Sequence, residues 1–174
     1  MGRKIEACND RLHGIGYALT SRRIPYEAID PSFRELIRTI NESGLKTVAC
    51  CSGTSCDHPS GFGLGGEIMF DVRTISEHQR NVMWNKTIGN DPVSFDFIIN
   101  NIYLPAKKIA MLKKIETAAQ KAGLHVYCFI ADNPRIMLRP TIEAVVDMPE
   151  TWTGEYVDDA TILKRFTKFA SLVK

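Results

Sequence analysis

Twice along this chain, the pattern of an amphipathic helix ends at a glycine and passes directly into a short apolar segment. Residues 43–50 (SGLKTVAC) resemble residues 122–129 (AGLHVYCF) in this respect. Glycine readily adopts the left-handed conformation that ends a helix, so both segments indicate helix, stop and strand. The likeness reflects either two repeated αβ units or the usual way of joining a helix to a strand. In both cases strands must form a sheet that helices cover, which predicts an α/β (α+β) class.

Apolar periodicity predicts three main helices. The first begins at Asp30-Pro31, because aspartate caps a helix N-terminus and proline suits the first helical position. The second covers residues 105–122, and the third begins at Asp158 and Asp159. The residues predicted to face inward are Phe33, Leu36, Ile37 and Ile40 in the first, Ile109, Leu112, Ile115, Ala119 and Ala122 in the second, and Ile162, Phe166, Phe169 and Val173 in the third.

Between these helices the sequence predicts extended segments, and a short helix within the polar residues 74–93. The extended segments are Leu45–Cys50, Glu67–Arg73, Phe95–Leu104, Leu124–Ala131, Arg135–Arg139 and Thr141–Val146. No linker divides the chain, so we expect a single domain over residues 1–174 with a mixed β-sheet flanked by about three main helices. Residues 1–29 are expected to form a partly mobile arm.

The charge balance gives little sign of a dedicated nucleic-acid-binding protein. The 22 lysines and arginines exceed the 20 acidic residues by two, whereas nucleic-acid binders usually carry a clear basic excess. Basic helix faces can nevertheless concentrate positive charge locally. Residues 164–169 (KRFTKF) interleave basic and aromatic side chains, which is ordinary amphipathicity or an RNA-facing patch.

Composition and the N-terminus favour a globular cytoplasmic protein. Hydrophobic residues make up 44% of the chain and charged residues 24%, as in ordinary globular proteins. No apolar run reaches the ~18 residues of a membrane span, and the N-terminus lacks the pattern of a signal peptide. The sequence therefore predicts no membrane partner, and it leaves the oligomeric state undetermined.

The glycine-rich segment 51–66 (CSGTSCDHPSGFGLGG) is predicted to be a long loop after a strand, where functional sites are common. Three kinds of chemistry fit it. Zinc could bind Cys51, Cys56 and His58, completed by His78 or Cys128, although the usual knuckle spacings are absent. Cys51 could be a nucleophile that His58 and Asp57 activate. Alternatively, the segments 52–55 and 61–66 could cradle a ligand, although no phosphate-binding motif is present.

Several short motifs resemble the wybutosine-synthesis tRNA methyltransferase family, which includes proteins like tRNA wybutosine-synthesizing protein 3. The likeness lies in Ile29-Asp30-Pro31, in Ile40-Asn41 and in residues 47–53 (TVACCSG), where the family's Cys-Ser-Gly falls on Cys51-Ser52-Gly53. Residues 136–139 (IMLR) resemble the family's Val-x-Ile-Arg strand, and Arg165-Phe166 in the last helix is similar too. Thr54 stands where the family has arginine.

The resemblance implies a domain that binds S-adenosylmethionine and methylates a modified guanosine in tRNA, within wybutosine biosynthesis. Methyl transfer depends mainly on positioning the two reactants. The absence of an obvious acid–base pair from the sequence is therefore compatible with this activity. The cofactor- or substrate-binding residues expected on this basis are Cys51, Ser52, Gly53, Asp57, His58 and Arg139. The alternative is a non-catalytic module that binds zinc or a small ligand through residues 50–66.

Overall fold

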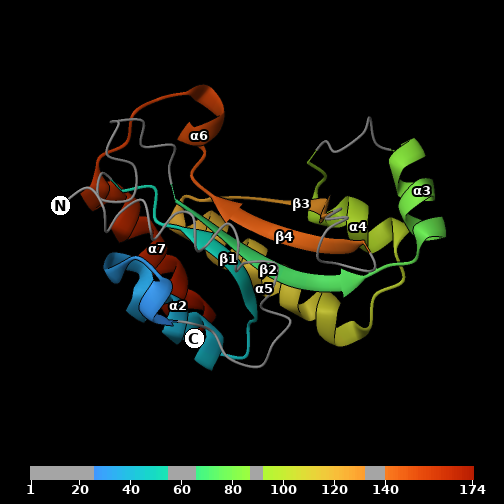
Figure 1. Ribbon diagram of the computed structural model, residues 1–174, viewed down its shortest axis with the longest axis horizontal. Coiled ribbons are helices and arrows are strands. Elements are labelled where there is room, and N and C mark those ends of the chain that lie inside the picture. Colours follow the sequence, from blue (N-terminus) through green and yellow to red (C-terminus); the bar gives the residue numbers. More distant parts are fainter. Residues whose placement is uncertain (1–25, 55–65, 87–91, 132–139) are drawn as a thin grey trace.

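The structure, a computed structural model, describes residues 26–54, 66–86, 92–131 and 140–174 (Figure 1). No helix in these ranges combines the length and the hydrophobicity needed to cross a lipid bilayer. The elements follow in this order: η1 (Tyr26–Ala28), α2 (Pro31–Glu42), β1 (Thr47–Cys51), β2 (Glu67–Thr74), α3 (Glu77–Lys86), α4 (Phe95–Asn101), α5 (Ala106–Ala122), β3 (His125–Ala131), β4 (Thr141–Asp147), α6 (Glu150–Thr153) and α7 (Asp159–Val173).

The sheet has four strands in the order β1-β2-β4-β3, and each neighbouring pair is antiparallel. The α+β class is therefore confirmed, but the expected mixed sheet is wrong for the described strands. For the two outer pairs the reason lies in the connections, since β1 runs into β2, and β3 into β4, with no described helix between them. Strands that follow each other in this way pair antiparallel, whereas parallel pairing needs a crossover connection.

The likeness between the two glycine-stopped segments extends to their topology. Gly44 (φ 88°) ends α2 before β1, and Gly123 (φ 76°) ends α5 before β3. Both of these strands lie at sheet edges, and each is followed by an inner strand, β2 or β4. The chain thus runs twice through helix, edge strand and inner strand, and the two inner strands pair at the centre of the sheet.

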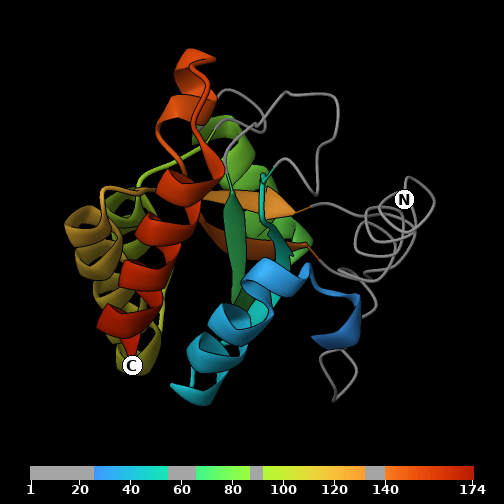
Figure 2. The ribbon, with the colours of Figure 1, turned by 90° about the vertical axis from the view of Figure 1, so that its left-hand side faces the viewer.

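Helices α2, α7 and α5 cover one face of this sheet (Figure 2). Phe70 of β2 packs against Phe169 of α7 with ring centroids 6.2 Å apart, and Phe33 of α2 contacts Phe166 at 5.1 Å. All the residues predicted to face inward are buried except Ile109, which is half-buried. The core therefore lies between this helical layer and the sheet, as the apolar periodicity predicts.

The predicted strand Phe95–Leu104 is instead the helix α4 and an extended tail. The Ser94 hydroxyl accepts a hydrogen bond from the Phe97 backbone N–H at 3.1 Å, which caps the helix. Phe95 and Ile98 are buried one helical turn apart. β-Branched and aromatic residues favour strands only weakly, so the cap and the burial of one helical face prevail here.

Other boundaries agree closely with the prediction, and some lie outside the described residues. The strands near residues 45–50, 67–73, 124–131 and 141–146 are present, and α3 lies within the polar segment 74–93. The segment 135–139 and the first 25 residues of the expected arm are not described. Residues 26–28 of that arm form η1, and Ile29 is buried in the core.

Gly66, directly before β2, should be intolerant of a side chain. A Cβ atom there would lie 2.7 Å from Phe166 Cε2, 2.8 Å from the Ser52 carbonyl oxygen and 3.0 Å from Phe33 Cζ. We expect Gly66→Ala to lower the free energy of unfolding by about 1–3 kcal/mol in denaturant titrations. Adding Phe166→Leu should reduce the cost of the alanine, because the leucine leaves more space.

Gly154→Ala provides the matched control for this double-mutant cycle of Gly66→Ala and Phe166→Leu. An added Cβ at Gly154 meets no atom within 4 Å, and its cost of about 1 kcal/mol would come from the positive φ of 71°. That cost should not change with Phe166→Leu. If Phe166→Leu reduced the cost of Gly66→Ala and of Gly154→Ala equally, the close packing of Phe166 against Gly66 would be contradicted.

Candidate functional site

The Cys51-Ser52-Gly53 motif forms a buried corner at the end of β1. Gly53 has a φ of 64°, a left-handed conformation that suits glycine, and it turns the chain sharply. The hydroxyls of Ser52 and Thr54 lie 2.9 Å apart and hydrogen-bond each other, and both residues are almost fully buried. Ser52 and Thr54 thus stabilise the turn, while Cys51 remains half-buried at the strand end.

Asn41, another residue of the resemblance, fixes the start of β1. Its amide donates to the Thr47 hydroxyl at 2.8 Å and to the Ile37 carbonyl at 2.8 Å. Its side-chain oxygen accepts from the Thr47 backbone N–H at 3.1 Å. A single amide side chain therefore joins the end of α2 to β1, and it holds the strand that leads to Cys51.

Cys51 opens a row of side chains that crosses all four strands. Cys51 pairs with Glu67, Glu67 pairs with Asp147, and Asp147 pairs with His125. Directly opposed residues share one face of a sheet, and this face is turned away from α7, which contacts Phe70 on the other side. We call it the polar face, and define it by Cys51, Glu67, Asp71, Tyr127, Glu143 and Asp147.

Glu143 is a strongly perturbed carboxylate of the polar face. It lies on the central strand β4, is 4% exposed, and stands directly opposite Asp71 of β2. Burial, and to a lesser degree the like charge of Asp71, raise the pKa of Glu143 to about 7. A carboxylate with this pKa can both accept and donate a proton near neutral pH, as a general base or acid must.

Asp147, four residues further along β4, is held by a tryptophan. The indole N–H of Trp152 donates to Asp147 Oδ2 at 2.8 Å. The other oxygen, Oδ1, is buried, and no other described residue donates a hydrogen bond to it. Burial raises the pKa of Asp147, although the Trp152 hydrogen bond and nearby His125 act in the opposite direction. Burial, and to a lesser degree the negative charges of Asp147 and Glu67, raise the pKa of Tyr127 as well.

An ion pair anchors the helix that carries Trp152. Arg165 of α7 contacts Glu150 of α6, with Nη1 and Oε2 2.8 Å apart, and both side chains are largely shielded from solvent. The same guanidinium donates to the Gly123 carbonyl at 3.3 Å. Arg165 therefore ties α6 to both α7 and the end of α5, which fixes Trp152 over the end of β4.

The structure brings only part of the predicted site together. Cys51, Ser52 and Gly53 are adjacent at the end of β1, whereas Cys56, Asp57, His58 and Arg139 lie outside the described residues. In the described ranges, no group of three or more histidine, cysteine or acidic side chains is placed to hold a metal ion. The activation of Cys51 by His58 and Asp57 stays a prediction.

The two residues proposed to complete a zinc site do not join Cys51. Cys128 is fully buried and pairs with Ala144 on the helix-covered face, so the sheet separates it from Cys51. Burial also raises the pKa of its thiol, which disfavours the thiolate that zinc requires. His78 is an exposed residue of α3.

Sequence reasoning did not single out Glu143, Asp147 or Trp152. A signal was present, because two carboxylates interrupt the otherwise mostly apolar segment 141–147 (TIEAVVD). In a strand, residues two or four apart share a face, so Glu143 and Asp147 had to lie on one side. What the sequence could not indicate is that this strand is central, and therefore that both carboxylates are buried.

The raised pKa of Glu143 predicts a specific dependence of stability on pH. Between pH 4.5, the ordinary pKa of a glutamate, and about pH 7, the Glu143 carboxyl group keeps its proton in the folded protein but loses it in the unfolded chain. Stability should therefore fall as the pH rises through this window. Glu143→Gln should raise the free energy of unfolding by about 1–3 kcal/mol at pH ~8 and by much less at pH ~4.

Urea titrations of the wild type and the variant at the two pH values measure this difference. Glu42→Gln, on the exposed end of α2, is the matched control and should change stability equally at both pH values. An effect of Glu143→Gln that is the same at both would contradict the raised pKa.

Comparisons with models of known protein families, with curated proteins and with solved structures find no match to this chain. The function is therefore argued from the residues and their geometry.

Proposed function

We propose that this protein binds tRNA and methylates a modified guanosine in it, with S-adenosylmethionine as methyl donor. The observation that carries the proposal is the separation of charge in the fold. Helix α5 and residues 159–174 together hold nine lysines and arginines and two acidic residues, a net charge of +7, whereas the whole chain has +2. The rest of the chain is therefore acidic, and the positive charge gathers on two packed helices.

Four of the five lysines of α5 lie on its outer side. Leu112, Ile115 and Ala119 face the core, while Lys107, Lys114 and Lys121 are exposed and recur every seven residues, about 10 Å apart along the helix. Exposed Lys164 and Lys168 extend the charge onto α7, which packs against α5. We call this surface the basic layer, and define it by Lys107, Lys113, Lys114, Lys121, Lys164 and Lys168.

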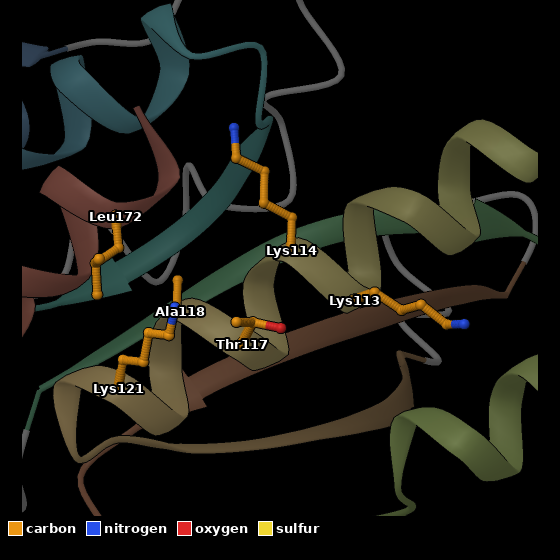
Figure 3. A pocket seen from close by; sticks show the side chains of 6 residues that line it. All are labelled: Lys113, Lys114, Thr117, Ala118, Lys121 and Leu172. Carbon is orange, nitrogen blue, oxygen red and sulfur yellow. The ribbon is translucent and has the colours of Figure 1, made fainter.

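A shallow hollow lies within the basic layer (Figure 3). It has a volume of about 330 Å³ and is lined by Lys113, Lys114, Thr117, Ala118, Lys121 and Leu172. Lys113 and Lys114 extend in different directions from α5, and Leu172 approaches from α7. The ammonium groups of Lys113 and Lys114 point apart, so these lysines could contact separate phosphates of an RNA backbone.

Most of these cations are available to a ligand. Lys108 donates to the Asp71 carbonyl and Arg165 pairs with Glu150, so both already have structural partners. Within the described part of the chain, the six lysines of the basic layer have no ion pair. Phosphates could thus bind them without first breaking an internal contact.

The composition of the basic layer favours RNA over a protein or a membrane. Protein interfaces are depleted of lysine and have an apolar centre. On α5 and α7, by contrast, lysines are frequent and Leu172 is the single exposed large apolar side chain. Interfaces with nucleic acids are polar and strongly positive. Insertion into a membrane would need a free apolar helix face, but the apolar faces of both helices are buried in the core.

The methyl-transfer part of the proposal draws on the resemblance of Cys51-Ser52-Gly53 and on the polar face that Cys51 opens. S-adenosylmethionine would supply an electrophilic methyl group on a positively charged sulfur. When a guanosine nitrogen takes that methyl group, it must lose a proton. The proposal requires the target base of the bound tRNA to reach the polar face, on the side of the sheet opposite the basic layer. There Glu143, with a pKa of about 7, would accept this proton.

The salt dependence of tRNA binding tests the basic layer. Lys114→Gln with Lys121→Gln should reduce the slope of log affinity against log salt by about 1.5–2, since each lost phosphate contact contributes about 1. The control is Lys46→Gln with Lys86→Gln, which removes the same charge from two other exposed lysines. Fluorescence anisotropy with labelled tRNA measures both. Equal losses in the two variants would refute the proposed surface.

Transfer of labelled methyl groups tests the catalytic part. Wild-type protein, tRNA that carries the unmethylated modified guanosine, and S-adenosylmethionine should give labelled tRNA. Glu143→Gln should slow this transfer by about 10²–10⁴-fold and leave the affinity for tRNA unchanged. Glu42→Gln serves again as the control. Absence of transfer by folded wild-type protein that binds both tRNA and cofactor would reject the methyltransferase assignment.

A further inference from the structure

We infer that the corner between the end of β4 and helix α6 is a binding site for an organic cation of the onium type, a methylated ammonium or a sulfonium. The corner is formed by Glu67, His125, Tyr127, Asp147 and Trp152. The affinity of this corner for cations does not depend on the proposed function. That its natural ligand is S-adenosylmethionine rests on the proposed function.

The first observation is the buried, half-satisfied carboxylate at the centre of the corner. Asp147 is 3% exposed, its Oδ2 accepts the Trp152 N–H, and no other described residue donates a hydrogen bond to its buried Oδ1. An unsatisfied charged oxygen in a desolvated position is costly, and a cation beside it would remove much of that cost. The Trp152 hydrogen bond and nearby His125 compensate the negative charge of Asp147 only in part, and a cationic ligand could supply the rest.

The second observation is the pair of aromatic rings beside this carboxylate. Tyr127 and Trp152 stand perpendicular, with ring centroids 5.2 Å apart, and His125 contacts Trp152 edge-on at 6.0 Å. The electron-rich faces of tryptophan and tyrosine attract cations, and cages of such rings recognise quaternary ammonium groups. Trp152 is 51% exposed, so a ligand from solvent can reach the indole.

The surrounding residues argue against the other cations that could neutralise Asp147. A metal ion needs several ligating side chains, and no suitable group of three exists in the described ranges. An internal lysine or arginine would lower the pKa of Asp147, yet among the described residues His125 is the only basic group that does so. An onium ion suits the corner, because it needs no hydrogen-bond acceptors and both aromatic rings and a carboxylate can stabilise it.

The position of the corner links it to the polar face. Glu67 and Asp147 are the middle members of the row that begins at Cys51, and Glu143 lies on the same side of β4. A cation held at Asp147 would thus share the polar face with both the Cys-Ser-Gly corner and the carboxylate that has a pKa of about 7.

Calorimetric titration with choline and with its neutral isostere 3,3-dimethyl-1-butanol tests the charge requirement. We expect choline to bind in the millimolar range, and the neutral isostere to bind at least tenfold more weakly. Asp147→Asn should weaken choline binding at least tenfold, and Trp152→Leu should weaken it too. Glu42→Gln, the exposed control, should not. Equal binding of the two probes, or an unchanged affinity in Asp147→Asn, would overturn the inference.

A second titration, with S-adenosylmethionine and the uncharged-sulfur product S-adenosylhomocysteine, separates this inference from the proposed function. Choline binding that depends on Asp147, without binding of S-adenosylmethionine, would leave the cation site standing and remove the proposed cofactor. Binding of S-adenosylmethionine that is unaffected by Asp147→Asn would support the cofactor and reject the cation site. Circular dichroism and urea unfolding of each variant confirm that it is folded.

Discussion

The burial of strand β4 on both faces is the constraint on which the rest of the structure depends. All seven of its residues are buried, because β2 and β3 flank it and the helical layer covers one side. On that side, Ile142, Ala144 and Val146 complete the core. On the other, the same burial removes Glu143 and Asp147 from water, which raises the pKa of each carboxyl group. The stability of the core and the unusual chemistry of the polar face thus have one origin.

Two periodicities divide the charge of the molecule between its layers. The period of 3.6 residues places the lysines of α5 and α7 on the outside of the helical layer, and the period of 2 places carboxylates on the opposite face of the sheet. A nearly neutral chain therefore has one surface suited to an anion and another suited to a cation. The two surfaces lie on opposite sides of the sheet.

The sequence predicted the elements better than the site, for physical reasons. Helix caps and stops such as Asp30, Gly44 and Gly123 are local, and local interactions largely decide where a helix begins and ends. The misassigned segment 95–104 shows the limit, because its strand-like composition was outweighed by the Ser94 cap and by burial. Likewise, Glu143 and Asp147 acquire their properties only from the order of strands in the sheet, which no single segment encodes.

The two edges of the sheet differ in structure. At one edge, the backbone N–H and C=O of Cys128 in β3 are both bonded to Val93, so an incoming strand would find these groups occupied. At the other, β1 is five residues long, and its register shifts between Thr47 and Ala49. Short and irregular edge strands are poor templates for further pairing. Both ends of the sheet are therefore protected against the edge-to-edge association that leads β-proteins to aggregate.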